Sequence, residues 1–518
     1  MAVKYYIGFD CGTLGTKVGI FTSEGETVVQ AFREHKMHYP RPGWVEMDAE
    51  QFYQVVTEGI CECLSKGKVD PQKVAGISCS GIICGQAPLD DNWKPVGPYI
   101  CFLDGRATKE AEELQRYPNS PWVAEAGNSE PASYQPPVVL KWVQKHRPEV
   151  IKKTKKVVAA APYVIGRLGN FKAKDAYIDW GHMSGWVIGF DARKRIWSER
   201  QIQALGLPFE WLPRAVKPWD IVGELSSEEA KKLGLKPGVP LVAGSGDIWQ
   251  SCLGSGLTGS GMCFDVAGTA SIFVITVDDL NPEITGTKML ITAMPTLDDL
   301  YAFWGFIPAG GFSLRWFRDE IYMRPGESSA YDELNEMAEK VVPGSDFTFF
   351  FPFLQGRGTP LQPQASGTWL GLRGSTKAGH LWRSIMESIA FEYKIWTQFL
   401  KEKGVSLNKV IGSGGGTYSQ LFNQIKADML NLEYVLPERG EGAILGNALL
   451  VAYAVGDVKD LKQTAKEWVR FKESFKPREN ARKFYEKVAV VRNKILDGPL
   501  TECFDNLTRL HEVSVPGS

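Results

Sequence analysis

Several common features are missing from this 518-residue sequence, and each absence argues against a class of protein. The net charge is only −1, so there is no overall positive charge to attract nucleic acid or anionic lipid. No apolar stretch approaches the roughly 20 residues that cross a membrane. The first apolar run is broken at Asp10, too early for a signal peptide. We therefore expect a cytoplasmic protein with no nucleic-acid or membrane partner.

Metal-binding clusters of cysteine and histidine are also lacking. The chain has nine cysteines and six histidines, and its closely spaced cysteine pairs have no further zinc ligands nearby. We therefore expect no structural metal site, and buried free thiols of the kind found in a reducing compartment. The cysteines that lie in apolar runs are Cys79, Cys84, Cys101, Cys252 and Cys263.

The usual glycine-rich nucleotide motifs are absent or weak. No Gly-x-x-x-x-Gly-Lys-Ser/Thr string exists, which excludes a P-loop. The stretch 254–259 does match Gly-x-Gly-x-x-Gly, but no buried strand leads directly into it and another strand follows within a few residues. We interpret it as a turn between a helix and a strand, and a dinucleotide site is disfavoured.

Glycine itself is abundant, with 53 residues, and one glycine-rich stretch carries polar groups. The stretch Gly8–Phe21, GFDCGTLGTKVGIF, predicts a strand, a tight turn and a second strand. Glycine lets backbone N–H groups approach an anion closely, and an aspartate at a strand end suits Mg²⁺. From these residues alone, a polar β-hairpin without a ligand stays open. The residues available for phosphate and metal are Asp10, Gly12, Thr13, Thr16 and Lys17.

The opening pattern returns about half the chain later. Phe264-Asp265-Val266-Ala267-Gly268-Thr269 repeats the strand that runs into Gly-Thr, and a strand follows again. The simplest account is an internal duplication whose two copies meet across a cleft and clamp one polyphosphate. A third loop, Gly412–Gly416, precedes a helix and could receive a nucleobase or ribose.

Alternating helices and strands predict an α/β fold. Asp48 is the expected N-cap of a helix that ends near Lys66. The pattern of residues 74–85 predicts a buried strand that leads into a loop. Apolar residues spaced by three and four predict a long helix through 382–400. A helix that follows the glycine-rich loop 412–416 is expected to end near Leu430, and another is expected over 443–454. The charged tail beyond about 465 also has helical character.

At this level of detail the chain resembles the FGGY family of carbohydrate kinases over nearly its whole length. The stretch 7–21 looks like the family's first phosphate hairpin. The stretch 40–52, PRPGWVEMDAEQF, looks like its Pro-Gly-Trp segment. The stretch 367–387, GTWLGLRGSTKAGHLWRSIME, fits its second signature throughout, whereas 139–149 is close to the first without matching it strictly. The resemblance implies two duplicated ribonuclease-H-like domains of the actin-like ATPase type. We expect them at 1–248 and 249–490, with a tail at 491–518.

The resemblance also implies roles for particular residues. Asp247 in 244-GSGD-247 would be the catalytic base, because a positioned carboxylate that accepts the sugar proton contributes about 10²–10⁴-fold. Asp10 would hold Mg²⁺ with Asp247 nearby, and ATP would be the phosphoryl donor. The nucleotide would meet Gly12, Thr13, Thr16, Lys17, Gly268, Thr269, Gly311, Arg315, Gly415, Gly416 and Ser419.

The sugar side departs from the family pattern. The loop 79–90, CSGIICGQAPLD, has neither the Met-His pair of xylulokinases nor the Arg-Glu pair of glycerol kinases. Asp104 does lie in a xylulokinase-like Asp-Gly-Arg run, and apolar residues follow the catalytic aspartate. The substrate residues we expect are Ser80, Ile82, Asp104, Ile248 and Trp249.

The predicted activity is transfer of the γ-phosphoryl group of ATP to a sugar or polyol, in the manner of a xylulokinase. A less polar substrate is our hypothesis: a deoxy or branched sugar, a signalling sugar or an unusual ketose. From another class, a non-catalytic nucleotide-binding regulator of the same fold stays open. A homodimer is left open as well.

Overall fold

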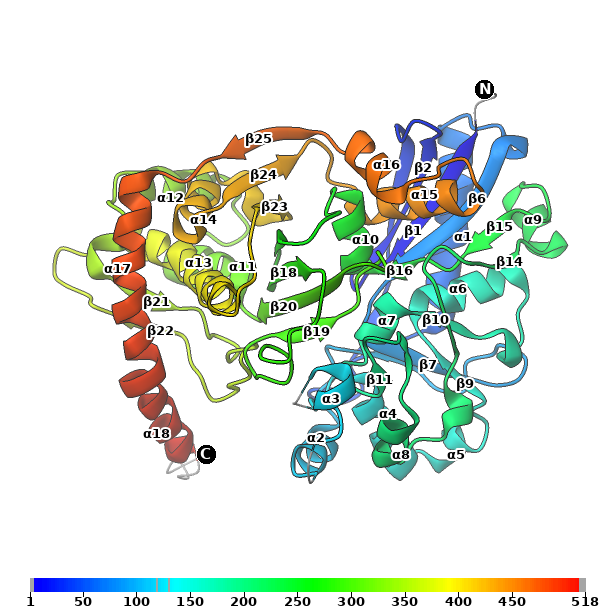
Figure 1. The fold of residues 1–518 in the computed structure, drawn as a ribbon, viewed down its shortest axis with the longest axis horizontal. Helices are drawn as coiled ribbons and strands as arrows, with labels where there is room; N and C mark the ends of the chain where they lie inside the picture. The colour runs from blue at the N-terminus through cyan, green and yellow to red at the C-terminus, as the bar shows by residue number, and fades with distance from the viewer. Residues whose placement is uncertain (1–3, 118–119, 129–130, 512–518) are drawn as a thin grey trace.

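Two seven-stranded mixed sheets form the centres of the two halves of the molecule (Figure 1). The computed structural model describes residues 4–117, 120–128 and 131–511. The first sheet is built from β1 (Tyr5–Cys11), β2 (Gly15–Thr22), β3 (Thr27–Glu34), β6 (Val74–Gly81), β14 (Ile221–Glu224), β15 (Pro240–Val242) and β16 (Ser245–Gly246). The second is built from β17 (Met262–Ala267), β18 (Ser271–Val277), β19 (Ile291–Ala293), β20 (Tyr301–Ile307), β23 (Lys409–Ser413), β24 (Glu433–Pro437) and β25 (Phe471–Phe475).

The two sheets repeat one topology. The order β3–β2–β1–β6–β15–β14 in the first corresponds to β20–β18–β17–β23–β24–β25 in the second. In both, the opening strand pairs antiparallel with the next strand and parallel with a later one, and an antiparallel strand closes the far edge. The expected duplication is therefore present, and the fold class is a two-domain α/β fold.

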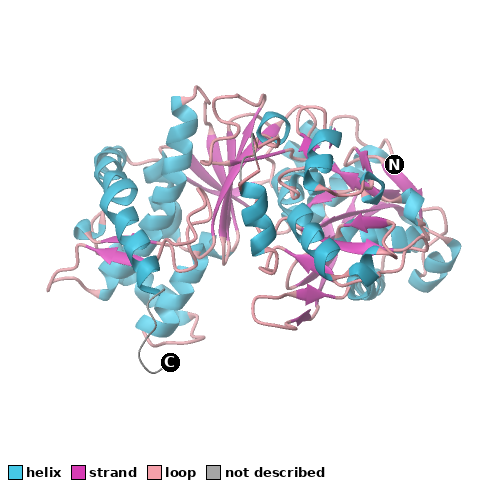
Figure 2. Cartoon of the chain, turned by 90° about the horizontal axis from the view of Figure 1, so that it is seen from below, coloured by secondary structure: helices cyan, strands magenta, loops and turns pink. Residues whose placement is uncertain are grey.

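Helices flank both sheets, and a smaller five-stranded sheet lies beside the first one (Figures 1 and 2). That sheet contains β4 (Met37–His38), β5 (Glu46–Met47), β7 (Gly85–Leu89), β8 (Tyr99–Cys101) and β9 (Lys156–Val158). The helices used below are α1 (Ala49–Lys66), α4 (Pro136–His146), α6 (Ala160–Gly169), α7 (Trp180–Ser184), α10 (Asp247–Gly254), α11 (Gly310–Trp316), α12 (Ser329–Glu339), α13 (Ala378–Glu402), α14 (Gln420–Leu430), α15 (Gly442–Ala454), α16 (Leu461–Trp468), α17 (Glu479–Ile495) and α18 (Thr501–His511).

Local signals in the sequence fix many of these elements. The Asp48 side chain accepts a hydrogen bond from the backbone N–H of Glu50 at 2.9 Å, so α1 begins at the predicted cap. The long amphipathic helix α13 and the turn 254–259 between α10 and β17 are also as predicted. All nine cysteines are free thiols, and the five cysteines expected to be buried are buried.

One feature differs from the expected organisation. The charged tail, expected to be helical, contains the edge strand β25. Composition did not indicate this strand, because it forms only by pairing with β24, an earlier segment of the chain. The expected boundary at 490 lies within helix α17. The expected boundaries at 248 and 490 stay predictions.

One helix crosses from the second half of the sequence to the first sheet. Helix α15 packs over β1 and β6 and against α10, and its apolar residues share a core cluster with Tyr6, Phe21 and Val242. Figure 1 shows α15 beside the blue strands of the first half. Helix α15 therefore belongs to the second half of the sequence but packs on the sheet of the first half. Among the described residues, no helix is both long and apolar enough to span a bilayer.

Candidate active site

Two carboxylates, those of Asp10 and Asp247, flank the end of β6. Asp10 lies opposite Ser80 in the register of β1 and β6, and β16 pairs with the other edge of β6, with Ser245 opposite Ser80. Asp247 follows β16 directly as the first residue of α10, and both aspartates are partly exposed. The strand pairing thus brings together two aspartates that are far apart in the chain.

The pKa of the Asp247 carboxyl group is higher in the protein than it would be in water. Burial, and then the charge of Asp10, raise the pKa of Asp247 to about 7. The backbone N–H of Ile248 donates to Asp247 Oδ1 at 2.7 Å and acts in the opposite direction. Burial also raises the pKa of Asp10, while the hydroxyl of Ser80 and the charge of Lys17 lower it. A carboxyl group whose pKa is near neutrality is suited to accept a proton during a reaction.

The first predicted phosphate hairpin joins β1 to β2. The backbone N–H of Gly12 donates to the carbonyl of Gly15 at 3.1 Å, which closes the turn. Asp10 and Lys17 lie opposite each other across the two strands, on one face, and Lys17 is exposed. Thr13 is partly exposed in the turn. Gly12, Thr13 and Lys17 therefore lie in the same hairpin as Asp10, and Lys17 is its cross-strand neighbour.

Thr16 does not join this group. The alternation along β2 that exposes Lys17 turns Thr16 inward, and only 1% of Thr16 is exposed. Its hydroxyl is buried without a hydrogen-bond partner in the structure. We expected Thr16 to contact phosphate, but the strand's pleat directs its hydroxyl into the protein.

A cavity of about 520 Å³ in the second half collects the remaining predicted nucleotide residues. Its wall includes the turn between β17 and β18, the start of α11 and the loop before α14. The backbone N–H of Gly311 donates to the carbonyl of Gly268 at 3.1 Å, which joins α11 to the turn. The predicted residues that line the cavity are Gly268, Thr269, Gly311, Arg315, Gly415, Gly416 and Ser419.

Helix α12 supplies cavity residues that the sequence reasoning missed. Tyr331, Asp332 and Asn335 line the cavity, and the indole N–H of Trp382 donates to Asn335 Oδ1 at 2.9 Å. Tyr418, also in the wall, is 86% exposed. No motif marks α12, because its residues enter the cavity only through tertiary packing.

The residues expected at the sugar lie mostly beneath the surface. Ile82, Ile248 and Trp249 are at most 7% exposed, and the indole N–H of Trp249 donates to the carbonyl of Gly181 at 3.2 Å. Ser80 is fully buried, and its hydroxyl donates to Asp10 Oδ1 at 2.8 Å. These buried side chains therefore offer little polar surface to a ligand.

The carboxylate of Asp104 is already hydrogen-bonded to other protein groups. Its two carboxylate oxygens accept hydrogen bonds from the backbone N–H groups of Val45 and Arg106 and two more from the Arg106 side chain, between 2.6 and 2.9 Å. Those four bonds use the acceptor positions of the carboxylate. We expected Asp104 to meet a sugar hydroxyl, but it anchors Arg106 instead.

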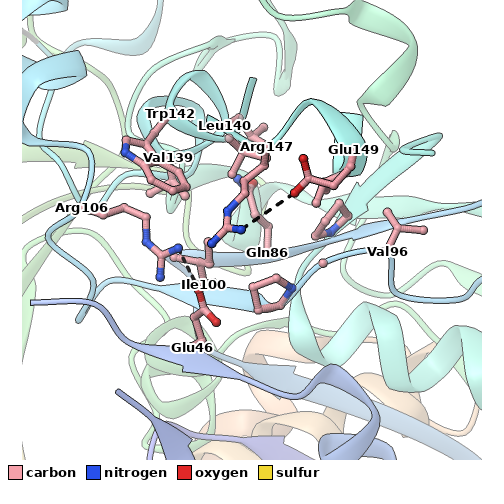
Figure 3. Close-up of a pocket in the computed structure, with 15 residues that line it drawn as sticks. Glu46, Gln86, Val96, Ile100, Arg106, Val139, Leu140, Trp142, Arg147 and Glu149 are labelled. Atoms are coloured by element: carbon pink, nitrogen blue, oxygen red, sulfur yellow. Dashed lines mark ion pairs between the residues drawn. The ribbon is translucent and has the colours of Figure 1, made fainter. Parts of the chain in front are cut away.

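Arg106 in turn borders a different cavity, of about 350 Å³, shown in Figure 3. Arg106 pairs with Glu46 at 2.8 Å, and Arg147 lies 3.9 Å from Glu149, as the dashed lines mark. Apolar residues of α4 form much of the wall. None of the predicted site residues lines this cavity.

A buried aspartate–histidine pair adjoins the carboxylates. His182 Nδ1 contacts the carboxylate of Asp179, which also accepts from the hydroxyl of Ser245 at 2.8 Å. The other ring nitrogen, Nε2, is buried without a partner in the structure. The charge of His182 lowers the pKa of both Asp10 and Asp247. No sequence pattern marks this pair, because a lone histidine outside any motif gives no signal.

The donor set around the carboxylate pair fits Mg²⁺ better than a metal held by protein alone. Among the described residues there is no group of three or more Cys, His, Asp or Glu side chains that could hold a metal ion. Mg²⁺ usually takes one or two carboxylates and completes its shell with water and phosphate oxygens. Asp10 and Asp247 are the two carboxylates that would hold such an ion.

Comparison with known proteins gives consistent results. Residues 5–254 match the FGGY family of carbohydrate kinases, N-terminal domain, and residues 264–455 match the C-terminal domain. The chain is 26% identical over 484 residues to a xylulose kinase of Bacillus subtilis (strain 168), covering 93% of this chain and 95% of that protein. It is 26% identical over 464 residues to a gluconokinase of the same strain, with 88% of each covered.

Solved structures share the fold. A xylulose kinase from Rhodospirillum rubrum superposes with a TM-score of 0.86 and 24% identity, over 98% of this chain and 99% of that one. A gluconate kinase from Lactobacillus acidophilus gives a TM-score of 0.88 and 21% identity, over 98% and 100%. At these identities the superpositions establish the fold, and the named substrates belong to those proteins.

Proposed function

Because the chain belongs to the FGGY family of carbohydrate kinases and is therefore a sugar or polyol phosphotransferase, we propose that Asp247 is its catalytic base. The observation that carries this proposal is the position of Asp247 at the start of α10, beside Asp10, with a pKa raised to about 7. ATP is the phosphoryl donor that this family implies.

In the proposed reaction, the substrate hydroxyl gives its proton to Asp247 as its oxygen bonds to the γ-phosphorus. The bond between that phosphorus and the β–γ bridging oxygen breaks, and ADP leaves. Lys17 and the N–H groups of the first hairpin would neutralise phosphate charge, and the cavity of the second half would hold the nucleoside. Mg²⁺, held by Asp10 and Asp247, would offset the charge of the phosphate oxygens.

We propose a substrate with fewer hydroxyl groups than a fully hydroxylated ketose. Apolar Ile248 and Trp249 directly follow Asp247 in the chain, and the polar pairs seen in xylulokinases and glycerol kinases are absent. A deoxy or branched sugar, or an unusual ketose, would lose fewer hydrogen bonds there than a fully hydroxylated sugar. We further propose that the enzyme acts in the cytoplasm, where ATP is available.

The experiment is ADP release from Mg·ATP across a panel of ketoses, polyols and deoxy sugars. Strong stimulation by one deoxy or branched sugar supports the substrate proposal. If plain D-xylulose has by far the highest kcat/KM, the substrate proposal is wrong while the kinase assignment stands. Turnover that no sugar stimulates would instead favour a nucleotide-binding regulator.

A further inference from the structure

Helix α15 touches the elements that carry both carboxylates, although it comes from the second half of the sequence. A Cβ on Gly8 of β1 would lie 2.5 Å from the carbonyl oxygen of Ile444, and one on Gly446 would lie 2.4 Å from that of Gln250 in α10. Only glycine permits such close approach of backbones. The α15 backbone is therefore fixed against the strand of Asp10 and the helix of Asp247.

Asn447 is a buried amide on this otherwise apolar helix. Its Nδ2 donates to the carbonyl of Phe9 at 2.8 Å and to Ser80 Oγ at 3.0 Å. Because a carbonyl oxygen only accepts, the contact with Phe9 determines which way the amide faces. Asn447 Oδ1 has no hydrogen-bond partner in the structure, and an apolar residue at this position would avoid that cost.

Ser80 links the amide of Asn447 to the carboxylate of Asp10 by hydrogen bonds. Since Ser80 Oγ accepts a hydrogen bond from Asn447, its own proton is directed to Asp10 Oδ1, at 2.8 Å. One carboxylate oxygen is thereby held against the sheet, and Oδ2 is left for the ligand side. The three side chains form a continuous path from α15 to the proposed metal carboxylate.

We propose that Asn447 is a positioning residue that, acting through Ser80, orients the Asp10 carboxylate for the Mg·nucleotide. This inference rests on the proposed function, because it needs Asp10 to hold the metal. Groups that orient a metal ligand commonly change metal affinity by roughly 10–100-fold when they are removed. The second half of the sequence would thus contribute to the metal site of the first half.

The test uses the full-length protein and needs no turnover. ADP affinity is measured by calorimetry with and without Mg²⁺ for wild type, Asn447→Ala, Ser80→Ala and the double variant. We expect each single change to reduce the Mg²⁺ enhancement of ADP affinity by roughly tenfold. The double variant should lose little more than one single change, because both act along one path. ADP affinity without Mg²⁺ should change little.

Ser78→Ala is the matched control. Ser78 is buried on the same strand, two residues before Ser80, and its hydroxyl has no partner in the structure. It should keep the wild-type Mg²⁺ enhancement. If Asn447→Ala does not fold, Asn447→Ser retains a polar group too short to reach Ser80 and serves in its place.

The inference is overturned if the variants lower Tm but keep the Mg²⁺ enhancement, because Asn447 would then be structural only. It is also overturned if the two losses multiply in the double variant. If wild type itself shows no Mg²⁺ enhancement, the proposed metal role of Asp10 fails, and this inference fails with it. The wild-type measurement therefore distinguishes the two failures.

Discussion

Asp10 and Asp247 lie close enough together that the charge of the first raises the pKa of the second. Two neighbouring carboxylates resist simultaneous ionisation unless a cation lies near them. This arrangement suits a site whose cation arrives with the nucleotide. It also leaves Asp247 able to accept a proton near neutral pH.

Replacing Asp247 by asparagine tests the base directly. Asp247→Asn keeps the size of the side chain but removes the proton acceptor, so kcat should fall by about 10²–10⁴-fold. ADP affinity without Mg²⁺ should stay close to wild type. Steady-state kinetics and calorimetry check the two parts. Normal turnover by the variant would show that another group accepts the proton.

Replacing His182 tests its influence on the pKa of Asp247. Its charge lowers the pKa of Asp247, so His182→Asn should raise that pKa. A base works deprotonated, so the acid limb of the kcat/KM profile should move to higher pH, and activity below pH 7 should fall most. The amide of the variant can still donate to Asp179, which preserves the local packing.

The exposed His38 provides the matched control for this measurement. His38→Asn should leave the profile unchanged. An equal loss of activity at every pH in His182→Asn would mean that His182 supports structure alone.

Lys17 is expected to act on the nucleotide. It is exposed on the same face as Asp10, where an ammonium group can meet phosphate oxygens. A hydrogen bond to a charged group contributes about 1.5–3 kcal/mol, so Lys17→Ala should raise the KM for ATP roughly tenfold or more. The sugar KM should change less. Lys36→Ala, at another exposed position, is the control, and equal ATP KM values for the two variants would remove Lys17 from the site.

Local patterns were enough to predict much of the fold. The cap at Asp48, the period of α13 and the two glycine hairpins each depend on residues close in sequence. The repeated Gly-Thr turns also indicated the duplication, because each copy carries its own signal. These features are encoded within single segments of the chain, where a sequence pattern can be read directly.

The remaining site features depend on contacts between distant segments. Asn447 reaches Ser80 only because α15 crosses to the first sheet, and His182 joins the carboxylates only through the packing of α7 on β16. Asp104 illustrates the opposite case, since a motif suggested a ligand contact but Arg106 occupies its oxygens. Sequence patterns identify residue types, whereas the orientation of each side chain depends on tertiary partners.

Gly311 tests the nucleotide cavity without changing any charged group. A Cβ at this position would lie 2.2 Å from the carbonyl oxygen of Gly268, and that atom is backbone that cannot rotate away. Gly311→Ala should therefore push α11 from the turn between β17 and β18, at a cost of about 1–3 kcal/mol. The KM for ATP should rise and Tm should fall, while the sugar KM stays near wild type. Gly374→Ala, where nothing lies within 4 Å, should leave all three unchanged. If Gly311→Ala lowers Tm but leaves the KM for ATP unchanged, the nucleotide does not depend on this turn, and its place in the cavity must be reassigned.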